Sequence, residues 1–304
     1  MKRTKPSEEF NDTSDSKKQL KTNKEVPTKQ LSYENQRLIL NWMDVDKRLE
    51  IFTRIPSLRT IEKSLPLHLD FLSFEETSMN LNSTTYLSES HDKVIEFLGR
   101  RSQPIVVRRL EVTSDHAPLG IGLKLHGICE LRITGNVKKM MQQLSTIIEN
   151  LENLQLDFLE INPDKETTDE DYKLPVIQNS KKTIVFGDSQ YGFAFLALVL
   201  PNVHFANGCS PDFAPDEVID IWRENGAPIG SRFTSGHGYE NAACIFEETR
   251  EAYNGEGERS FSIPIIDSDD SQIKVEMVKM ENIDVRYPTD TWLITYEVVT
   301  PLWQ

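Results

Sequence analysis

Cysteine is scarce in this chain. Its 304 residues include three cysteines, Cys129, Cys209 and Cys244, which are widely spaced and form no Cys-x-x-Cys pair. An odd, scattered set in a chain without a signal peptide argues against a disulfide framework and for a reducing compartment. We therefore expect an intracellular protein, cytoplasmic or nuclear.

Long apolar runs are also missing. The longest lies around Phe193 to Val199, well short of the ~20 residues that span a bilayer, and predicts a buried helix instead. The net charge is −14, which would repel the backbone of a nucleic acid. We expect neither a membrane nor a nucleic acid as partner. The chain is long enough to build a core without a metal or disulfide.

Catalytic signatures are weak. Residues 184–189 read IVFGDS, which resembles the nucleophile block of GDSL-type esterases, where a distant histidine activates the serine of Gly187-Asp188-Ser189. Such an enzyme needs an Asp-x-x-His unit downstream. The histidines after Ser189, His204 and His237, have proline and threonine in the place of that aspartate. A turn leaving a strand explains the block as well, so we predict no catalytic residues and no enzyme.

Ligand-binding signatures fare no better. His237 lies between two glycines without any phosphate-binding loop, and Cys209 with His204 lacks the second pair of a zinc site. The acidic loop Asp164 to Asp171 lacks the glycine and closing glutamate of a calcium loop. We expect Trp222, Trp292 and Trp303 to pack in the hydrophobic core and not to line a ligand-binding pocket. We predict no cofactor and no metal.

The most informative stretch is Leu31 to Leu69, which predicts three short helices. Ser32 can cap the first, which runs to about Met43; Asp44 can cap the second; Pro56-Ser57 opens the third. Five of the six residues from Leu38 to Met43 are apolar, too many for a helix with one wet face. Either this helix is sandwiched within the chain or it meets another protein.

At these residues the sequence resembles the F-box. Leu31 falls on the opening leucine of that pattern, Glu34 on its acidic position, and Asp44 on its aspartate. The sequence departs from the pattern in two places: Ser32 stands where proline is usual, and Asn35-Gln36 stand where an apolar residue is usual. The apolar pairs and second-helix positions match at Ile39-Leu40, Trp42-Met43, Leu49 and Ile51. The chain from about 31 to 304 is also similar to a nematode-expanded family of F-box-like proteins with an associated domain of unassigned function. The phrases that carry this similarity lie at 54–74 (RIPSLRTIEKSLPLHLDFLSF), 82–87 (NSTTYL) and 219–233 (IDIWRENGAPIGSRF).

This resemblance implies a substrate receptor of a cullin-type ubiquitin ligase, in which the helical block docks on an adaptor and the rest binds a target protein. The residues expected to bind the adaptor are Leu31, Leu38, Ile39, Trp42, Met43, Leu49 and Phe52. An alternative is a folded binding module whose degenerate helical block acts outside any ligase.

The remaining sequence predicts a mixed α+β and α/β fold in three parts: a disordered tail at 1–30, the helical block at 31–69, and an α/β domain at 70–304. The tail holds eight basic and five acidic residues and too little apolar surface to offset its ordering entropy. In the body, strands and helices alternate from Cys129 onward, which favours a parallel sheet lined by helices, like an irregular solenoid.

Individual elements follow from local periodicity. Pro104 to Val112 predicts a strand whose Arg108 and Arg109 lie at a solvated edge or face a ligand. Met140, Leu144, Ile148 and their neighbours predict one helix over Val137 to Leu151, followed by a strand over Leu154 to Ile161. Three β-rich runs, at 260–266, 273–280 and 292–300, predict antiparallel strands that close the C-terminal end.

Overall fold

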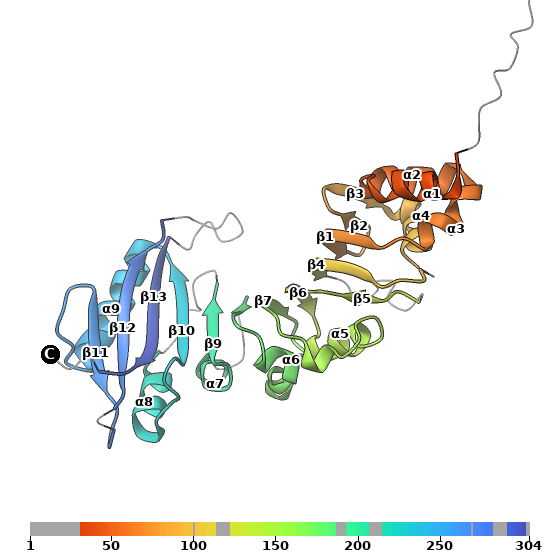
Figure 1. The fold of residues 1–304 in the computed structure, drawn as a ribbon. Helices are drawn as coiled ribbons and strands as arrows, with labels where there is room; N and C mark the ends of the chain where they lie inside the picture. Colours follow the sequence, from red (N-terminus) through yellow and green to blue (C-terminus); the bar gives the residue numbers. More distant parts are fainter. Residues whose placement is uncertain are drawn as a thin grey trace, which may run out of the picture.

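The computed structural model describes residues 31–99, 101–113, 122–186, 193–206, 215–268, 270–281 and 291–301. The predicted tail at 1–30, Gly187-Asp188-Ser189, Cys209 and Trp303 lie outside these residues. The described part is a mixed α/β structure built on one continuous sheet (Figure 1).

Three short helices precede the sheet, as predicted. Ser32 accepts a hydrogen bond from the Asn35 amide at 3.3 Å, and Pro56 begins the single 3-10 turn η1 before the third helix. Asp44 occupies the N-cap position of the second helix without a side-chain cap bond. The elements are α1 (Tyr33–Asn41), α2 (Val45–Arg54), η1 (Pro56–Leu58) and α3 (Arg59–Lys63). The predicted block extended to Leu69, but β1 begins at Leu67, so from here on the name helical block refers to residues 31–65.

The sheet has a parallel middle and antiparallel ends. Its order is β11-β12-β13-β10-β9-β8-β7-β6-β4-β1-β2-β3, with β5 beside β4. From β4 to β10 the parallel strands follow one another in chain order, with helices in most of the connections, so the predicted parallel sheet lined by helices is present. The parallel strands are β1 (Leu67–Phe74), β4 (Ile105–Val112), β5 (Leu125–His126), β6 (Glu130–Gly135), β7 (Phe158–Pro163), β8 (Thr183–Val185), β9 (Asn202–Phe205) and β10 (Arg232–His237).

Antiparallel strands close both ends of this run. At the N-terminal end the hairpin β2 (Ser78–Leu81) and β3 (Thr84–Leu87) adds to β1. At the C-terminal end β13 (Trp292–Val299) returns to pair with β10, followed by β12 (Gln272–Lys279) and β11 (Ser260–Pro264). The predicted C-terminal antiparallel strands are confirmed.

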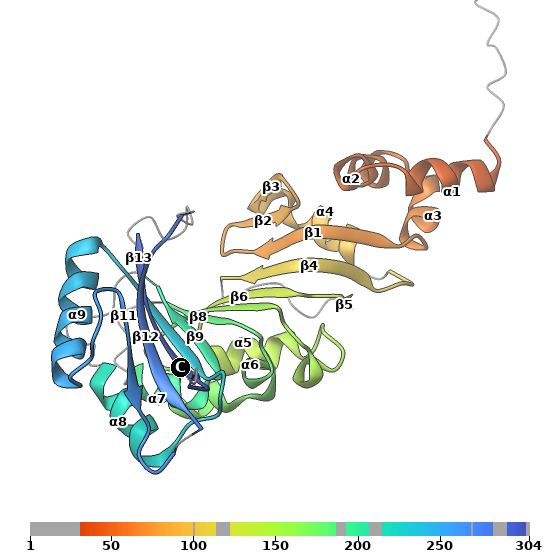
Figure 2. The same cartoon turned by 60° about the vertical axis from the view of Figure 1, so that its left-hand side comes forward.

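The helices of the body cover one face of the sheet. One apolar cluster joins the inward residues of the strands, such as Leu110, Leu131 and Phe233, to residues of these helices such as Phe97, Met140 and Phe246. Figure 2 shows α5 to α9 along the outer side of the curved sheet. The elements are α4 (Ser88–Leu98), α5 (Val137–Leu144), η2 (Leu151–Asn153), η3 (Asp169–Lys173), α6 (Pro175–Gln178), α7 (Phe193–Val199), α8 (Pro215–Asn225) and α9 (Tyr239–Ala252). In the part of the chain that the structure describes, no helix covers the opposite face, which we call the open face.

Three local predictions were wrong. The helix predicted over Val137 to Leu151 ends at Leu144, because the Ile147 carbonyl turns to accept a hydrogen bond from the Leu125 amide at 2.8 Å. The strand predicted from Leu154 begins at Phe158. The strand with Arg108 and Arg109 is not an edge, since β4 pairs with β1 on one side and with β5 and β6 on the other.

Candidate protein-binding surface

The outer face of α1 exposes a group of large apolar side chains. Leu38 and Trp42 are four residues apart, which places them on one stripe at the end of the helix, and Ile39 flanks it, while Leu31 lies just before the N-cap residue Ser32. Trp42 is 86% exposed, and the other three are between 43% and 58% exposed. We call these four residues the apolar stripe.

The opposite side of α1 is packed against α3. Leu40 is buried against Ile61 and Leu65, with Met43 and Leu58 partly buried beside them. This small cluster explains why α1 is stable at nine residues, since packing and not helix propensity must hold so short a helix. The apolar stripe therefore adds nothing to this packing.

The structure divides the seven residues expected at a partner surface. Leu31, Leu38, Ile39 and Trp42 form the apolar stripe, and Met43 is half-buried. Leu49 and Phe52 are buried in the main core, where the Phe52 ring meets Phe97 edge-on at 5.5 Å between centroids. These two residues hold α2 on the body and are not available to a partner.

Two shallow clefts lie beside the C-terminal end of α1. The first, of about 360 Å³, lies between Leu38 on α1 and Pro66 at the end of the block. The second, of about 500 Å³, lies between the α1–α2 turn at Met43-Asp44 and the β2–β3 turn at Asn82-Ser83. Asn41 and Pro66 line both clefts, so the two recesses adjoin each other beside the end of α1.

A buried ionic cluster, which we call the Glu62 clamp, fixes the helical block on the body. Glu62 is fully buried, and its Oε1 accepts hydrogen bonds from Arg48 Nη2 at 2.8 Å and Arg101 Nη2 at 2.9 Å. Arg48 also donates to the Pro66 carbonyl at 2.9 Å, and Arg101 to the Leu65 carbonyl at 2.9 Å. Burial lowers the pKa of the Arg48 guanidinium, and the Glu62 carboxylate opposes that shift. The clamp ties α2, α3 and the segment after α4 into one unit.

A second polar contact joins the block to the sheet. The Asp46 carboxylate at the start of α2 accepts from Thr84 Oγ1 and Tyr86 Oη on β3, both at 2.7 Å. Burial and the nearby Asp46 raise the pKa of the Tyr86 hydroxyl, so it stays a donor at any physiological pH. The apolar stripe is thus presented in a fixed orientation.

The chemical candidates from the sequence do not form an active site in the described residues. His204 is buried on β9, where its Nδ1 lies 2.7 Å from Thr234 Oγ1, and His237 is buried at the end of β10. Asp164 and Asp171 of the acidic loop hold the local backbone, the latter in a capping box with Thr168. Residues 31–301, taken without the undescribed segments, contain no group of three or more histidine, cysteine or acidic side chains placed to hold a metal ion.

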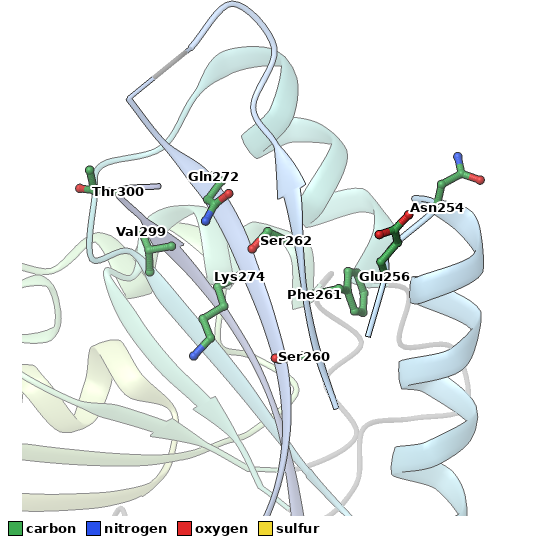
Figure 3. Close-up of a pocket in the computed structure, with 9 residues that line it drawn as sticks. All are labelled: Asn254, Glu256, Ser260, Phe261, Ser262, Gln272, Lys274, Val299 and Thr300. Carbon is green, nitrogen blue, oxygen red and sulfur yellow. The ribbon is translucent and has the colours of Figure 1, made fainter. Parts of the chain in front are cut away.

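A large cleft of about 770 Å³ lies at the C-terminal end, over β11 and β12 (Figure 3). Ser260, Ser262 and Lys274 line it from the strands, and Lys274 Nζ is already paired with Glu276 at 3.0 Å. Figure 3 shows Asn254 and Glu256 at its far side, near the end of α9. It gathers neither a nucleophile with a base nor a set of metal ligands.

The fold defines a mixed α/β protein whose parallel strands follow in chain order, and whose described helices are too short or too polar to cross a membrane. Residues 87–237 match the family model described as a domain of unknown function, DUF3557. The match begins at the last residue of β3 and ends at the last residue of β10, so the helical block and the C-terminal antiparallel strands lie outside it. No curated protein and no solved structure matches the chain.

Proposed function

We propose that this protein is a non-enzymatic interaction module that serves as a substrate receptor of a cullin-type ubiquitin ligase. In this proposal the helical block resembles an F-box and docks on the ligase adaptor, while the α/β body binds the target. The observation that carries it is the apolar stripe. An exposed tryptophan beside exposed leucine and isoleucine, on a helix already packed on its other side, is typical of a protein interface.

The rigid attachment of the helical block supports the same role. A receptor must hold its target at a fixed position relative to the ligase, and the Glu62 clamp and the Asp46 contacts immobilise the block on the sheet. The clamp also fixes Pro66, which lines both clefts, since Arg48 donates to the Pro66 carbonyl.

A test is capture of the full chain by the immobilised adaptor subunit. We expect Leu38→Asp/Trp42→Asp to lose capture by more than about tenfold, because apolar anchors at the centre of an interface carry most of its affinity. Leu87→Asp/Ile229→Asp is the matched control: it also replaces two exposed apolar residues, 65% and 60% exposed, and adds the same charge. Circular dichroism verifies that both variants fold.

The outcomes separate the alternatives. If the native chain is not captured, the protein is not a ligase receptor. If the control loses capture and the α1 variant does not, binding occurs elsewhere on the molecule.

A second candidate, a binding module outside any ligase, is favoured by the start of α1. Ser32 and Gln36, two residues that depart from the F-box pattern, are used locally: Ser32 caps the helix, and Gln36 Nε2 donates to the Leu31 carbonyl at 2.9 Å. For this candidate we expect the native chain to fail the adaptor test and Leu38→Asp/Trp42→Asp still to lower binding to another protein.

A further inference from the structure

Strand β1 has an unpaired edge in its N-terminal half. It pairs with β4 along its length, from Leu67 to Phe74, but with β2 only from Leu72 to Phe74. The β2–β3 hairpin ends opposite Phe71, where the Asn82 amide donates to the Phe71 carbonyl at 2.8 Å. From Leu67 to Leu69, no strand of the described residues therefore lies on the side of β1 away from β4.

The backbone groups on this edge are satisfied on both sides of His68 but not at His68 itself. The Pro66 carbonyl accepts from Arg48 at 2.9 Å, and the Asp70 amide donates to Asn82 Oδ1 at 2.9 Å. Successive residues of a strand turn their amide and carbonyl to opposite sides, so those of His68 point to the same edge as these two groups. Among the described residues, neither has a hydrogen-bond partner on that edge.

A cleft opens at this edge. It is the recess of about 500 Å³ whose wall runs from the α1–α2 turn past Pro66 and His68 to the β2–β3 turn. We call this cleft, with the backbone of His68, the β1 slot. An unpaired strand edge that lines a cleft suits the addition of another strand. Main-chain hydrogen bonds then supply affinity, and the surrounding wall selects the side chains.

The charges in the β1 slot favour a basic side chain. In the described part of the chain, Asp44 is exposed and makes neither a cap bond nor an ion pair. Asp46 accepts hydrogen bonds from two hydroxyl groups of β3, which are neutral donors. Arg48 is the one lysine or arginine of the cleft wall, and it is 4% exposed and held by the Glu62 clamp. Two carboxylates thus line the cleft without a cation of their own.

The β1 slot is continuous with the apolar stripe. Trp42, which is 86% exposed, lies between Asn41 and Met43 in the sequence, and both of these neighbours line the cleft. A protein that covers Trp42 is therefore already at the mouth of the slot.

We propose that the β1 slot binds an extended segment of the partner protein that contacts the apolar stripe. The segment adds to β1 as a short strand. It accepts a hydrogen bond from the His68 amide, donates one to the His68 carbonyl, and places a lysine or arginine beside Asp44. This inference rests on the proposed function in one respect: there, the partner is the ligase adaptor.

The test uses the full chain and an octapeptide of alternating lysine and valine, with blocked termini and a fluorescein label, followed by fluorescence anisotropy. We expect the native protein to bind it and His68→Pro to weaken binding about fivefold, because proline removes a main-chain donor. Proline is tolerated in a strand where the amide faces no neighbouring strand, so the variant should fold. His68→Ala is the matched control: it also removes the imidazole but keeps the amide, and should bind within about twofold of native.

Three further measurements separate strand pairing from attraction between charges. A fully N-methylated peptide of the same sequence carries the same charge but cannot pair with a strand. It controls for attraction to the net charge of −14, needs no protein variant, and is expected not to bind. A peptide of alternating glutamate and valine is also expected not to bind. Asp44→Asn should weaken binding of the lysine–valine peptide about threefold, since an exposed ion pair contributes little.

Three results overturn the proposal: no binding of the lysine–valine peptide by the native protein, equal binding by native protein and His68→Pro, or equal binding of the N-methylated peptide. Adaptor capture through α1 is measured separately. A native chain that binds the peptide at His68 but is not captured excludes the ligase function and keeps the β1 slot. Capture without peptide binding does the reverse.

Discussion

The two ends of the sheet are closed in different ways. At the C-terminal end large aromatics are buried between helix and sheet: Trp222 of α8 meets Phe233 of β10 edge-on at 5.6 Å, and Phe233 stacks on Tyr296 of β13 at 4.2 Å. At the N-terminal end the β2–β3 hairpin closes the sheet, and the helical block beyond it leaves Trp42 exposed. Closing a sheet end does not require exposed apolar side chains. The apolar stripe is therefore not explained by the closure of the sheet.

The two ends also differ in what holds them together. The C-terminal end depends on apolar and aromatic packing, whereas the helical block is joined to the body by Phe52 and by a buried ionic cluster. An apolar contact is tolerant of small shifts, but hydrogen-bonded charges fix distance and angle. The end that carries the candidate interface is thus the one with the more directional attachment.

The largest expected effect on stability comes from comparing alanine substitutions of Trp222, at the C-terminal end, and Trp42, at the N-terminal end. Trp222→Ala removes a side chain that is 2% exposed and should lower the free energy of unfolding by about 3–5 kcal/mol, through lost burial and the cavity left behind. Trp42→Ala should change it by less than about 0.5 kcal/mol. Urea denaturation measures both. A comparable loss for Trp42 would mean that the apolar stripe is part of the core, which would break the contrast between the two ends.

The Glu62 clamp should have the next largest effect. Glu62→Gln leaves Arg48 and Arg101 buried with like charges and one neutral acceptor, so we expect a loss of about 3 kcal/mol in the free energy of unfolding. Glu50→Gln, on the exposed face of α2, also breaks two ion pairs, with Lys47 and Arg54, and should cost less than about 1 kcal/mol. If the two variants lose equal stability, the clamp does not anchor the block.

Local signals in the sequence were sufficient where local chemistry decides the structure. Ser32 and Pro56 mark helix starts that depend on one side-chain bond and one fixed backbone angle, and both starts were predicted correctly. The alternation of strand and helix also predicted the parallel sheet, and three β-rich runs predicted its antiparallel C-terminal end. Helix periodicity failed at Ile147 and Ile148, which are buried as a helix would require but pack beside Leu125 of β5.

Long-range contacts could not be read from the chain. Arg48, Glu62 and Arg101 are 14 and 39 residues apart, and a charged residue on a short helix is ordinarily solvated. Leu49 and Phe52 have the same apolar character as Leu38 and Trp42, so the sequence could not tell which helix faces the body. Arg108 and Arg109 were placed at an edge because strand order depends on pairings that are distant in sequence.

The smallest expected effect concerns α8 and α9 at the C-terminal end of the sheet. Acidic side chains lie close together on these helices, whereas α1 at the other end exposes apolar ones. Burial, Asp220 and Glu248 raise the pKa of the Asp216 carboxyl on α8, which means that its charged form is disfavoured in the folded protein. The raised pKa contributes stability below the unfolded pKa of that carboxyl, and this contribution is lost as the pH rises through the folded pKa. Asp216→Asn should therefore raise the free energy of unfolding at neutral pH, by only about a few tenths of a kcal/mol because water screens this exposed group. The gain should vanish in acid, where the native carboxyl is also neutral.

Glu217→Gln removes the same charge from the same first turn of α8 and should bring no gain in the free energy of unfolding. Stabilisation by Asp216→Asn that persists in acid would show that the side-chain shape is responsible, and not the burial of the charge and its repulsion by Asp220 and Glu248.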